Sequence, residues 1–437
     1  MPFTLSAAQT GAFDSILIDA VANKLTPALF FGVTNAEGPL YLRTVGTKLV
    51  DDPASEPIDE DTVFWLCSQT KLITTIAALK LIEQGKITLD TPVETVLPEL
   101  ANPVIVTAHD EAGRPTASTP AKGKILFGQL LNHTSGLDYY LDGTIPMTDP
   151  ARGIPIACSY KYKEGEGVPK FLEIIKGSLP SIPLRFEPGT NFAYGFSSDI
   201  AGFVTERLSG QTLEQYFQEH IFTPLGLTST SFYLTPLLKE RLLPLSYRSP
   251  NGTLERWSGP PVVDLDPATV RVHMGGGGLY GSQKDYLTIL RHLLQIQGTH
   301  PTTSCYLHTL IKIPNYLLAG TATNPILSRA SVDSMFEPTL PPAGADTLDG
   351  AISSFAPYLG QLPNTAQFGR GVYVNTEDIP GKRRKGSGAW SGWASTSFFV
   401  DPTSGVAAVF GTQLAPTGDD MHERKYNELE RVLYSEL

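Results

Sequence analysis

The chain has 437 residues, of which 41% are hydrophobic and 18% charged, a balance typical of a globular protein with a substantial core. Its formal net charge of −11 argues against nucleic acid as a partner, because phosphate binding needs a basic surface. No run approaches the roughly 18 apolar residues that span a bilayer, and the N-terminus lacks the basic and apolar regions of a signal peptide. We therefore expect a cytoplasmic protein that binds neither nucleic acid nor membranes.

Cysteine and histidine do not form metal-binding patterns. The three cysteines, Cys67, Cys158 and Cys305, are too few and too scattered for a disulfide framework or a CxxC site. The eight histidines include no H-E-x-x-H or comparable spacing. The sequence accordingly predicts no metal and no organic cofactor.

The N-terminal part predicts a helix, a hairpin and a second helix. Apolar residues recur with helical spacing over 12–24. Two strand-like runs at 28–34 and 39–46 flank "NAEG", which indicates a hairpin. The stretch "LCSQTKLITTIAALKLIEQGK" then predicts a helix over 69–84, with Gly85 as the residue that ends it.

The composition changes between about residues 90 and 330, where Pro, Gly and Thr are frequent and helical pieces are short. Strand signals return beyond 365, and the chain closes with a charged helix. This order predicts an α/β fold whose sheet is built from both termini, with a mostly helical insertion beside it and a cleft between them. We set the boundaries at 1–80 and 330–437 for the α/β part and 81–329 for the insertion.

Ser68 and Lys71 stand three residues apart where the second helix begins. Residues i and i+3 share a helix face, so the hydroxyl and the amine can meet. The unpaired N–H groups and the positive dipole end favour an oxyanion there and disfavour a second positive charge. The pair therefore suits a nucleophile and its base. The alternative is a helix cap with a solvated lysine, although the apolar surroundings make Lys71 an unusual surface charge.

Other patterns point away from competing chemistries. No G-x-S-x-G occurs, so the nucleophile elbow of α/β-hydrolases is absent. The run "HMGGGGLYGSQKDYLTIL" lacks the G-K-[ST] of a phosphate loop. We expect its glycines, 275–278, to bend the chain at the cleft rim and Ser282 to cap the next helix.

"SQTK" opening a helix and "LLNHTSGL" some sixty residues later resemble the serine β-lactamase and penicillin-binding-protein superfamily. The resemblance is to its class C-like branch, which includes family VIII carboxylesterases and the fungal acyltransferase of the lovastatin pathway. It covers nearly the whole chain. It implies an antiparallel sheet flanked by helices plus a mostly helical subdomain. It also implies that His133, within "NHTSGL", is structural and shapes a turn.

The resemblance assigns the second catalytic element to Tyr194, within "EPGTNFAYGFSSDIAGF". Tyr194 would share a proton with Lys71, act as base for Ser68 and serve as acid for the leaving group. The asparagine usual in this Y-x-N motif is replaced by Phe196, so the role of that amide in holding substrate is in doubt. We include Phe196 among the candidate substrate-binding residues. A core tyrosine under a loop is the structural alternative.

The third element of β-lactamases is K-T-G on a strand, and Trp390-Ser391-Gly392 matches its three positions. Tryptophan in place of lysine removes the expected anchor for a β-lactam carboxylate. Glycine at 392 would let a substrate carbonyl approach the strand closely, so Trp390, Ser391 and Gly392 are candidate substrate-binding residues. The resemblance implies an oxyanion hole from the backbone N–H groups of Ser68 and Trp393. Alternation of Trp390 and Trp393 with small residues would leave space for an apolar acyl chain. The alternative is that both tryptophans are ordinary strand aromatics.

"GKRRKGS" is the one concentrated basic run of the sequence. A solvated hairpin is the simpler interpretation. The other is that Arg383, Arg384 or Lys385 meets an anionic part of a substrate or acyl carrier, and we include Arg384 among the candidate substrate-binding residues.

Together these features predict a serine-dependent acyl-transfer enzyme acting on ester or thioester carbonyls of small molecules. Hydrolysis and transfer to an alcohol both remain open at this stage. The alternatives are a β-lactamase-like hydrolase of cyclic amides and a non-catalytic binding member of the fold.

Overall fold

The computed structural model describes most of the chain, with internal gaps. The described residues are 3–111, 113–141, 155–258, 266, 268–298, 322–355, 362–415 and 417–437. Cys305 lies outside them. No helix within these ranges is both long and apolar enough to cross a membrane.

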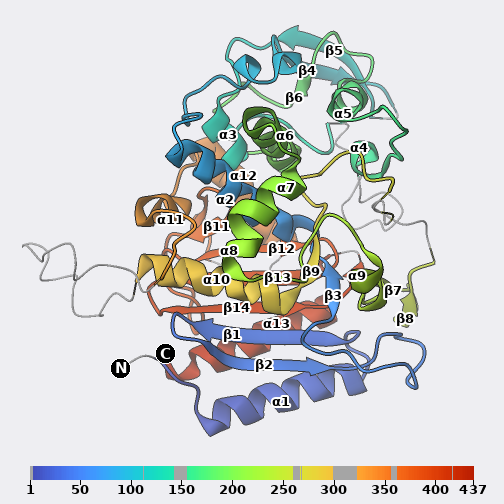
Figure 1. The fold of residues 1–437 in the computed structure, drawn as a ribbon, viewed down its shortest axis with the longest axis vertical. Coiled ribbons are helices and arrows are strands. Elements are labelled where there is room, and N and C mark those ends of the chain that lie inside the picture. Colours follow the sequence, from blue (N-terminus) through green and yellow to red (C-terminus); the bar gives the residue numbers. More distant parts are fainter. Residues whose placement is uncertain are drawn as a thin grey trace, which may run out of the picture.

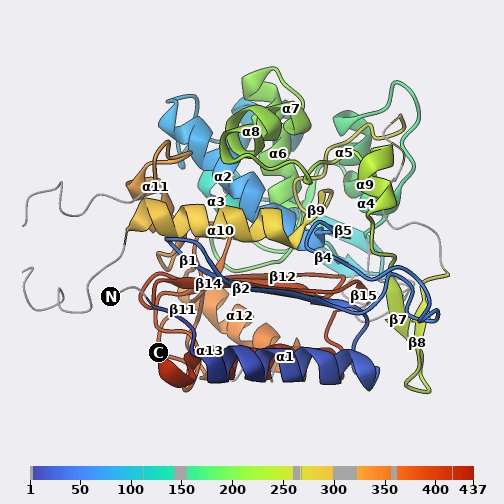
Figure 2. The same cartoon turned by 60° about the horizontal axis from the view of Figure 1, so that its bottom comes forward.

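A seven-stranded sheet divides the molecule and takes its strands from both ends of the sequence (Figures 1 and 2). The strand order is β10-β11-β12-β13-β14-β1-β2, and every neighbouring pair is antiparallel. The strands are β1 (Leu29–Asn35), β2 (Pro39–Val45), β10 (Ala366–Phe368), β11 (Tyr373–Asn375), β12 (Gly388–Gly392), β13 (Thr396–Asp401) and β14 (Val406–Gly411). The predicted antiparallel sheet flanked by helices is confirmed.

Helices cover both faces of this sheet, because its central strands carry large apolar side chains that point alternately to either side. Phe31 faces the layer that contains α1 (Ala7–Ala22) and α13 (Asp420–Leu433). Its neighbour Phe30 faces the opposite layer, where α10 (Gln283–Gln297) lies across β1 and β14. Figure 2 shows the two layers on either side of the strands.

The N-terminal predictions agree with the structure. The helix expected over 12–24 is α1, which begins earlier because Ser6 caps it by accepting a hydrogen bond from the Gln9 backbone. The hairpin expected from 28–34 and 39–46 is the β1–β2 pair.

The helix expected over 69–84 is α2 (Thr70–Glu83), which is buried along most of its length. Gly85 follows its end with a left-handed φ of 68°, as predicted for the residue that ends the helix. The strand β3 (Val63–Trp65) precedes α2 and pairs with β9 (Tyr280–Ser282), so the glycine-rich segment before β9 is held beside the start of α2.

The middle of the chain forms short helices and small sheets around α2, and α6 (Ser197–Ser209) packs directly on it. The remaining helices are α3 (Phe127–Leu131), α4 (Ile156–Ser159), α5 (Val168–Lys176), α7 (Leu213–Phe217), α8 (Thr223–Leu225), α9 (Pro236–Glu240), α11 (Arg329–Met335) and α12 (Pro342–Phe355). The remaining strands are β4 (Val104–His109), β5 (Pro115–Pro120), β6 (Pro183–Leu184), β7 (Ser246–Arg248), β8 (Leu254–Arg256) and β15 (Leu414–Ala415).

The division into an α/β part (1–80 and 330–437) and an insertion (81–329) stays a prediction. The large sheet does draw its strands from the two terminal segments. However, α10 belongs to the insertion by sequence and packs on the sheet, with Leu287 against Gly32 of β1. The insertion and this face of the sheet therefore share one hydrophobic core.

The basic run lies in the connection between β11 and β12, beside α13. Arg383 is buried with its Nε 3.2 Å from Glu430 Oε1, and Lys382 Nζ lies 3.8 Å from the other oxygen of Glu430. Burial lowers the pKa of Lys382 to about 8, against the raising effect of Glu430. These two cations are structural charges that share one buried carboxylate.

Arg384 and Lys385, the other two cations of the run, face carboxylates at the surface. Arg384 lies 3.8 Å from Asp378 and donates a 2.9 Å hydrogen bond to the carbonyl of Leu437. Lys385 lies 3.5 Å from Glu377. The run precedes β12, so it lies at the end of that strand opposite Gly392.

We expect Glu430→Gln to destabilise the protein by about 3–5 kcal/mol, because it leaves two buried cations without their carboxylate. Urea unfolding followed by tryptophan fluorescence measures this change. The matched control is Glu428→Gln on the same helix, whose half-exposed ion pair with Lys425 contributes at most about 1 kcal/mol. Equal unfolding midpoints for the two variants would contradict the prediction.

Candidate active site

Ser68 lies in a single 3-10 turn, Cys67–Gln69, that leads directly into α2. Cys67 adopts a φ of 49°, a conformation that is uncommon for residues other than glycine. Neither the turn nor α2 has a side-chain cap, and the Ser68 hydroxyl instead accepts a 3.0 Å hydrogen bond from Lys71. The helix-cap interpretation of Ser68 is therefore wrong.

Lys71 is 2% exposed and its amine has three hydrogen-bond partners. Its Nζ lies 3.0 Å from Ser68 Oγ, 3.1 Å from Tyr139 Oη and 2.6 Å from the carbonyl oxygen of Gly276. The ring of Tyr194 covers a further side, with its centroid 4.6 Å from Nζ. Each of these four contacts presents to the amine a group that attracts positive charge.

Tyr194 meets Lys71 through its ring face, while its hydroxyl points to the sheet. The Tyr194 hydroxyl accepts a 3.0 Å hydrogen bond from the indole N–H of Trp390 on β12. No hydrogen bond joins it to Ser68 in the described part of the chain. The structure thus brings Ser68, Lys71, Tyr194 and Trp390 into one cluster, and the predicted proton exchange with Tyr194 stays a prediction.

The end of β12 lies against the serine turn because Gly392 has no side chain. A Cβ at this position would lie 2.6 Å from the Leu66 carbonyl oxygen and 2.3 Å from Thr396 Oγ1, closer than any side chain can approach. Ser391 pairs with Ser397 of β13 and is partly exposed. The strand predicted to support the substrate carbonyl therefore runs beside the candidate nucleophile.

Trp393 follows β12 and is also at the serine turn. Burial raises the pKa of Cys67, opposed by hydrogen bonds from the backbone amides of Ala394 and Trp393. The Trp393 amide therefore lies beside the residue that precedes Ser68. Its ring is buried with Trp65, at a centroid distance of 5.9 Å. An oxyanion hole from the amides of Ser68 and Trp393 remains a prediction.

His133 is packed among aromatic rings and contacts no candidate nucleophile. Its ring lies 5.0 Å from that of Tyr194 and 5.3 Å from that of Phe368. Burial, with a smaller contribution from Lys71, lowers its pKa to about 3. Its φ of 60° turns the chain after α3. His133 therefore acts as a structural residue that supports Tyr194.

Two polar residues of the cluster carried no sequence signal of their own. Tyr139, six residues beyond His133 in "NHTSGLDYY", accepts a hydrogen bond from Lys71, and Asp199 in the first turn of α6 accepts one from the Gly276 amide at 2.8 Å. Both follow segments that the motifs do identify. Phe196, a candidate substrate-binding residue, is instead 6% exposed and packs edge-on to Tyr139 at 4.8 Å.

The glycines of 275–278 let this segment approach α2 and α6 closely. A Cβ on Gly275 would lie 2.6 Å from the Ser198 carbonyl oxygen, and one on Gly276 would lie 2.6 Å from Asp199. Ser282 caps α10 by accepting from the Asp285 backbone, as predicted. Within the described ranges, no three His, Cys, Asp or Glu side chains gather closely enough to hold a metal ion.

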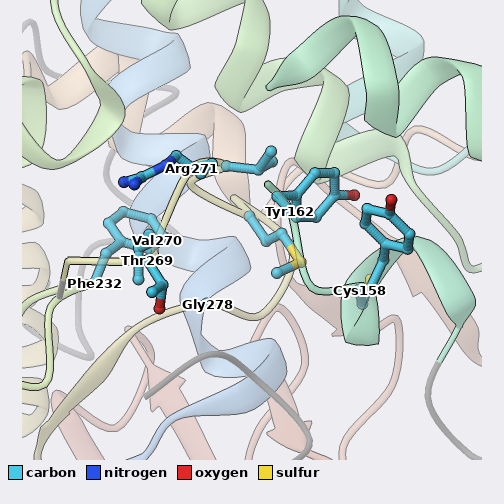
Figure 3. A pocket seen from close by; sticks show the side chains of 10 residues that line it. Cys158, Tyr162, Phe232, Thr269, Val270, Arg271 and Gly278 are labelled. Atoms are coloured by element: carbon cyan, nitrogen blue, oxygen red, sulfur yellow. The ribbon is translucent and has the colours of Figure 1, made fainter. Parts of the chain in front are cut away.

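A pocket lies beside the glycine segment, and Figure 3 shows the side chains that line it. Most are apolar or aromatic, including Tyr162, Phe232 and Met274, and Arg271 is exposed at its edge. Met274 and Gly278 belong to the segment whose Gly276 carbonyl holds Lys71. The same segment therefore contributes to the pocket lining and to the contacts of Lys71.

A serine and a buried lysine beside the end of a strand that terminates in glycine define a serine acyl-transfer site on a β-lactamase-like fold. The family model described as Beta-lactamase matches residues 13–433, so the chain belongs to that family. The resemblance indicated by the motifs is confirmed.

Two curated relatives match along nearly their whole length. The chain is 31% identical over 405 residues to the lovastatin esterase of Penicillium rubens, covering 90% of each protein. It is 28% identical over 430 residues to the monacolin J acid methylbutanoyltransferase of Aspergillus terreus, covering 95% of this chain and 94% of the relative. The chain is accordingly an enzyme of acyl transfer or ester hydrolysis.

Solved structures agree on the fold. The unliganded selenomethionyl form of simvastatin synthase (LovD) from Aspergillus terreus superposes with a TM-score of 0.77 at 26% identity, covering 98% of this chain and 99% of that one. EstCE1, described as a hydrolase with promiscuous acyltransferase activity, superposes with a TM-score of 0.71 at 21% identity, with 98% and 99% coverage. At that identity the second comparison supports the fold alone.

We expect Gly392→Ala to lower kcat/KM for a p-nitrophenyl ester at least about 10-fold, because its Cβ must push β12 away from the serine turn. The matched control is Gly11→Ala in α1, where a Cβ meets no atom within 4 Å. That change should leave activity intact and stabilise the helix by about 0.5–1 kcal/mol. Wild-type kinetics for Gly392→Ala would show that β12 does not need this close approach.

Proposed function

We propose that Ser68 is the nucleophile of an esterase that also transfers acyl groups to alcohols, and that Lys71 is its base. The observation that carries the proposal is the 3.0 Å hydrogen bond between Ser68 Oγ and a lysine amine that is 2% exposed. Burying a lysine at the first turn of a helix costs free energy. Proton exchange with the adjacent serine accounts for its position there.

In the acylation step, Ser68 Oγ attacks the carbonyl carbon of an ester or thioester while its proton passes to Lys71 Nζ. The carbonyl electron pair moves to the oxygen, which the amides of Ser68 and Trp393 stabilise. Tyr194 supplies a proton to the leaving group as the tetrahedral intermediate collapses, and Lys71 restores the proton of Tyr194. A second nucleophile, water or an alcohol, then releases the acyl group by the reverse sequence.

We assign the pocket beside the glycine segment to the apolar part of a small-molecule substrate. Its aromatic and aliphatic lining suits a small apolar group, such as the end of a short acyl chain, better than a charged group. The two curated relatives are named as a lovastatin esterase and a monacolin J acid methylbutanoyltransferase, which supports a small-molecule ester, or the alcohol from which it is made, as the substrate. An acyl carrier as donor and a cytoplasmic location both remain predictions.

Main-chain and side-chain features disfavour the alternatives. Trp390 replaces the lysine of K-T-G and is engaged with Tyr194, so the expected anchor for a β-lactam carboxylate is missing. The combination of Ser68 with a buried Lys71 would be unnecessary in a non-catalytic binding protein.

The test is reaction with a short-chain p-nitrophenyl ester. Absorbance measures the released p-nitrophenol, and mass spectrometry of the protein and its peptides locates the acyl adduct. The wild type should show a burst of p-nitrophenol and an acyl adduct on Ser68, and Ser68→Ala should show neither. Lys71→Ala should lose at least about 10³-fold in acylation rate, since the two residues act as a unit. Added alcohols should divert the acyl group into ester products.

The matched control is Lys80→Ala, on the same helix, where the amine donates a hydrogen bond to the Ile326 carbonyl instead of to a group of the site. Its rate should equal that of the wild type. An adduct on another residue, or full activity of Lys71→Ala, would refute the assigned mechanism. Turnover of a β-lactam faster than of esters would favour the lactamase alternative.

A further inference from the structure

Asp199 is a fully buried carboxylate with one oxygen satisfied and one not. Its Oδ1 accepts the 2.8 Å hydrogen bond from the Gly276 amide. Its Oδ2 is buried and has no hydrogen bond of standard geometry to any residue that the structure describes. Oδ2 and the Tyr139 hydroxyl lie on the same side of Gly276, 2.6 and 2.8 Å from the position that a Cβ there would occupy.

Tyr139 has a single proton to donate, and its surroundings determine the direction. Burial, and then the charge of Asp199, raise the pKa of Tyr139 well above its usual value, so it remains a neutral phenol. Its oxygen lies 3.1 Å from Lys71 Nζ and accepts a hydrogen bond from that amine. The phenol proton is then free for Asp199, whose pKa the Tyr139 hydroxyl helps to lower as a hydrogen-bond donor.

We propose that Tyr139 and Asp199 are positioning residues that aim the lone pair of Lys71 at Ser68. The protonated amine donates to all three partners, whereas the deprotonated amine that acts as base has two N–H bonds and one lone pair. If the N–H bonds point to the Gly276 carbonyl at 2.6 Å and to Tyr139, the lone pair faces Ser68 Oγ at 3.0 Å. This inference rests on the proposed function.

The proton balance of the step is unchanged by this arrangement. The Ser68 O–H bond breaks as Oγ bonds to the carbonyl carbon, and the proton forms a new N–H bond at Lys71. Tyr139 and Asp199 gain and lose no proton, and they act as asymmetric hydrogen-bond partners that fix the rotation of the amine. Asp199 does so indirectly, by keeping the Tyr139 proton turned away from Lys71.

The packing around Phe196 supports the assignment. At this position the Y-x-N motif has a polar amide, whereas the Phe196 ring here packs edge-on against Tyr139. Phe171 packs against the other side of Phe196 at 5.6 Å. The phenol is therefore held laterally by apolar rings, and its hydroxyl is the polar group that reaches Lys71 from that side.

Protonation of Asp199 should reverse the direction of the hydrogen bond between Tyr139 and Asp199. Burial raises its pKa to about 6, against the lowering effects of Lys71 and the Gly276 amide. The titratable groups that face Asp199 are Lys71, Tyr139, Cys158 and Tyr162. Above that pH the carboxylate accepts from Tyr139. Below it, the carboxylic acid can donate to Tyr139 and turn the phenol proton toward Lys71, where it competes with Ser68. Acylation should therefore rise with pH through about 6.

The experiment compares rates of Ser68 acylation by a p-nitrophenyl ester in the full-length protein. Asp199→Asn retains an oxygen for the Gly276 amide and places an NH₂ group toward Tyr139. This donor turns the phenol proton of Tyr139 toward Lys71. We expect the acylation rate to fall about 10- to 100-fold, with KM little changed, and the rise near pH 6 to vanish. Tyr139→Phe should fall by a similar factor, because one N–H of Lys71 loses its acceptor.

The double variant Tyr139→Phe/Asp199→Asn distinguishes positioning from general disruption. Without the phenol, Asp199→Asn has no proton to turn toward Lys71. The double variant should therefore acylate no more slowly than Tyr139→Phe alone. Multiplied losses would overturn the inference. If Asp199→Asn fails to fold, the pH profile of Tyr139→Phe decides, because it should lack the rise near pH 6.

The matched control is Asp285→Asn, another mostly buried aspartate, which accepts from the Ser229 amide and the Thr230 hydroxyl away from the site. Its acylation rate should stay within about twofold of the wild type. Wild-type rates for both Asp199→Asn and Tyr139→Phe overturn this inference and leave the proposed function intact. Absence of an acyl adduct in the wild type overturns both.

Discussion

The burial of one amine, Lys71 Nζ, is the constraint on which the arrangement of the site depends. Removing a cation or amine from water costs several kcal/mol unless polar partners replace the lost hydration. The partners here are a backbone carbonyl, a phenol, the serine hydroxyl and a tyrosine ring. They come from separate segments, so the core on this side of the sheet must close around α2 for the amine to be tolerated.

The same amine also determines the path and the composition of the glycine segment 275–278. Its Gly276 carbonyl must reach within 2.6 Å of Lys71 while its amide reaches Asp199 on another helix. Any side chain at Gly275 or Gly276 would collide with α6 or with that carboxylate. A loop that satisfies both groups at once has to pass between two helices, and only glycine leaves room for it.

Local patterns predicted the parts of the site that neighbours along the chain determine. Three-residue spacing at a helix start is enough to bring Ser68 and Lys71 together, and a glycine two residues after Trp390 is enough to indicate close approach of a strand. The Tyr139 contact could not be predicted in this way, because it depends on how the chain after His133 folds over α6. The basic run was ambiguous for the same reason. Nothing near Arg383 in sequence reveals that Glu430 on the C-terminal helix buries it.

The pairing of β1 with β14 has a consequence for biosynthesis. Nearly the whole chain separates these strands, so β1 can pair only with β2 until the last segment has been made. At roughly 5–20 residues per second this interval lasts tens of seconds. During it, an apolar strand presents an unpaired edge, which is a template for association with other chains. The serine turn also lacks the β12 strand that completes it, so a nascent chain exposes an aggregation-prone edge before it acquires any acylating activity.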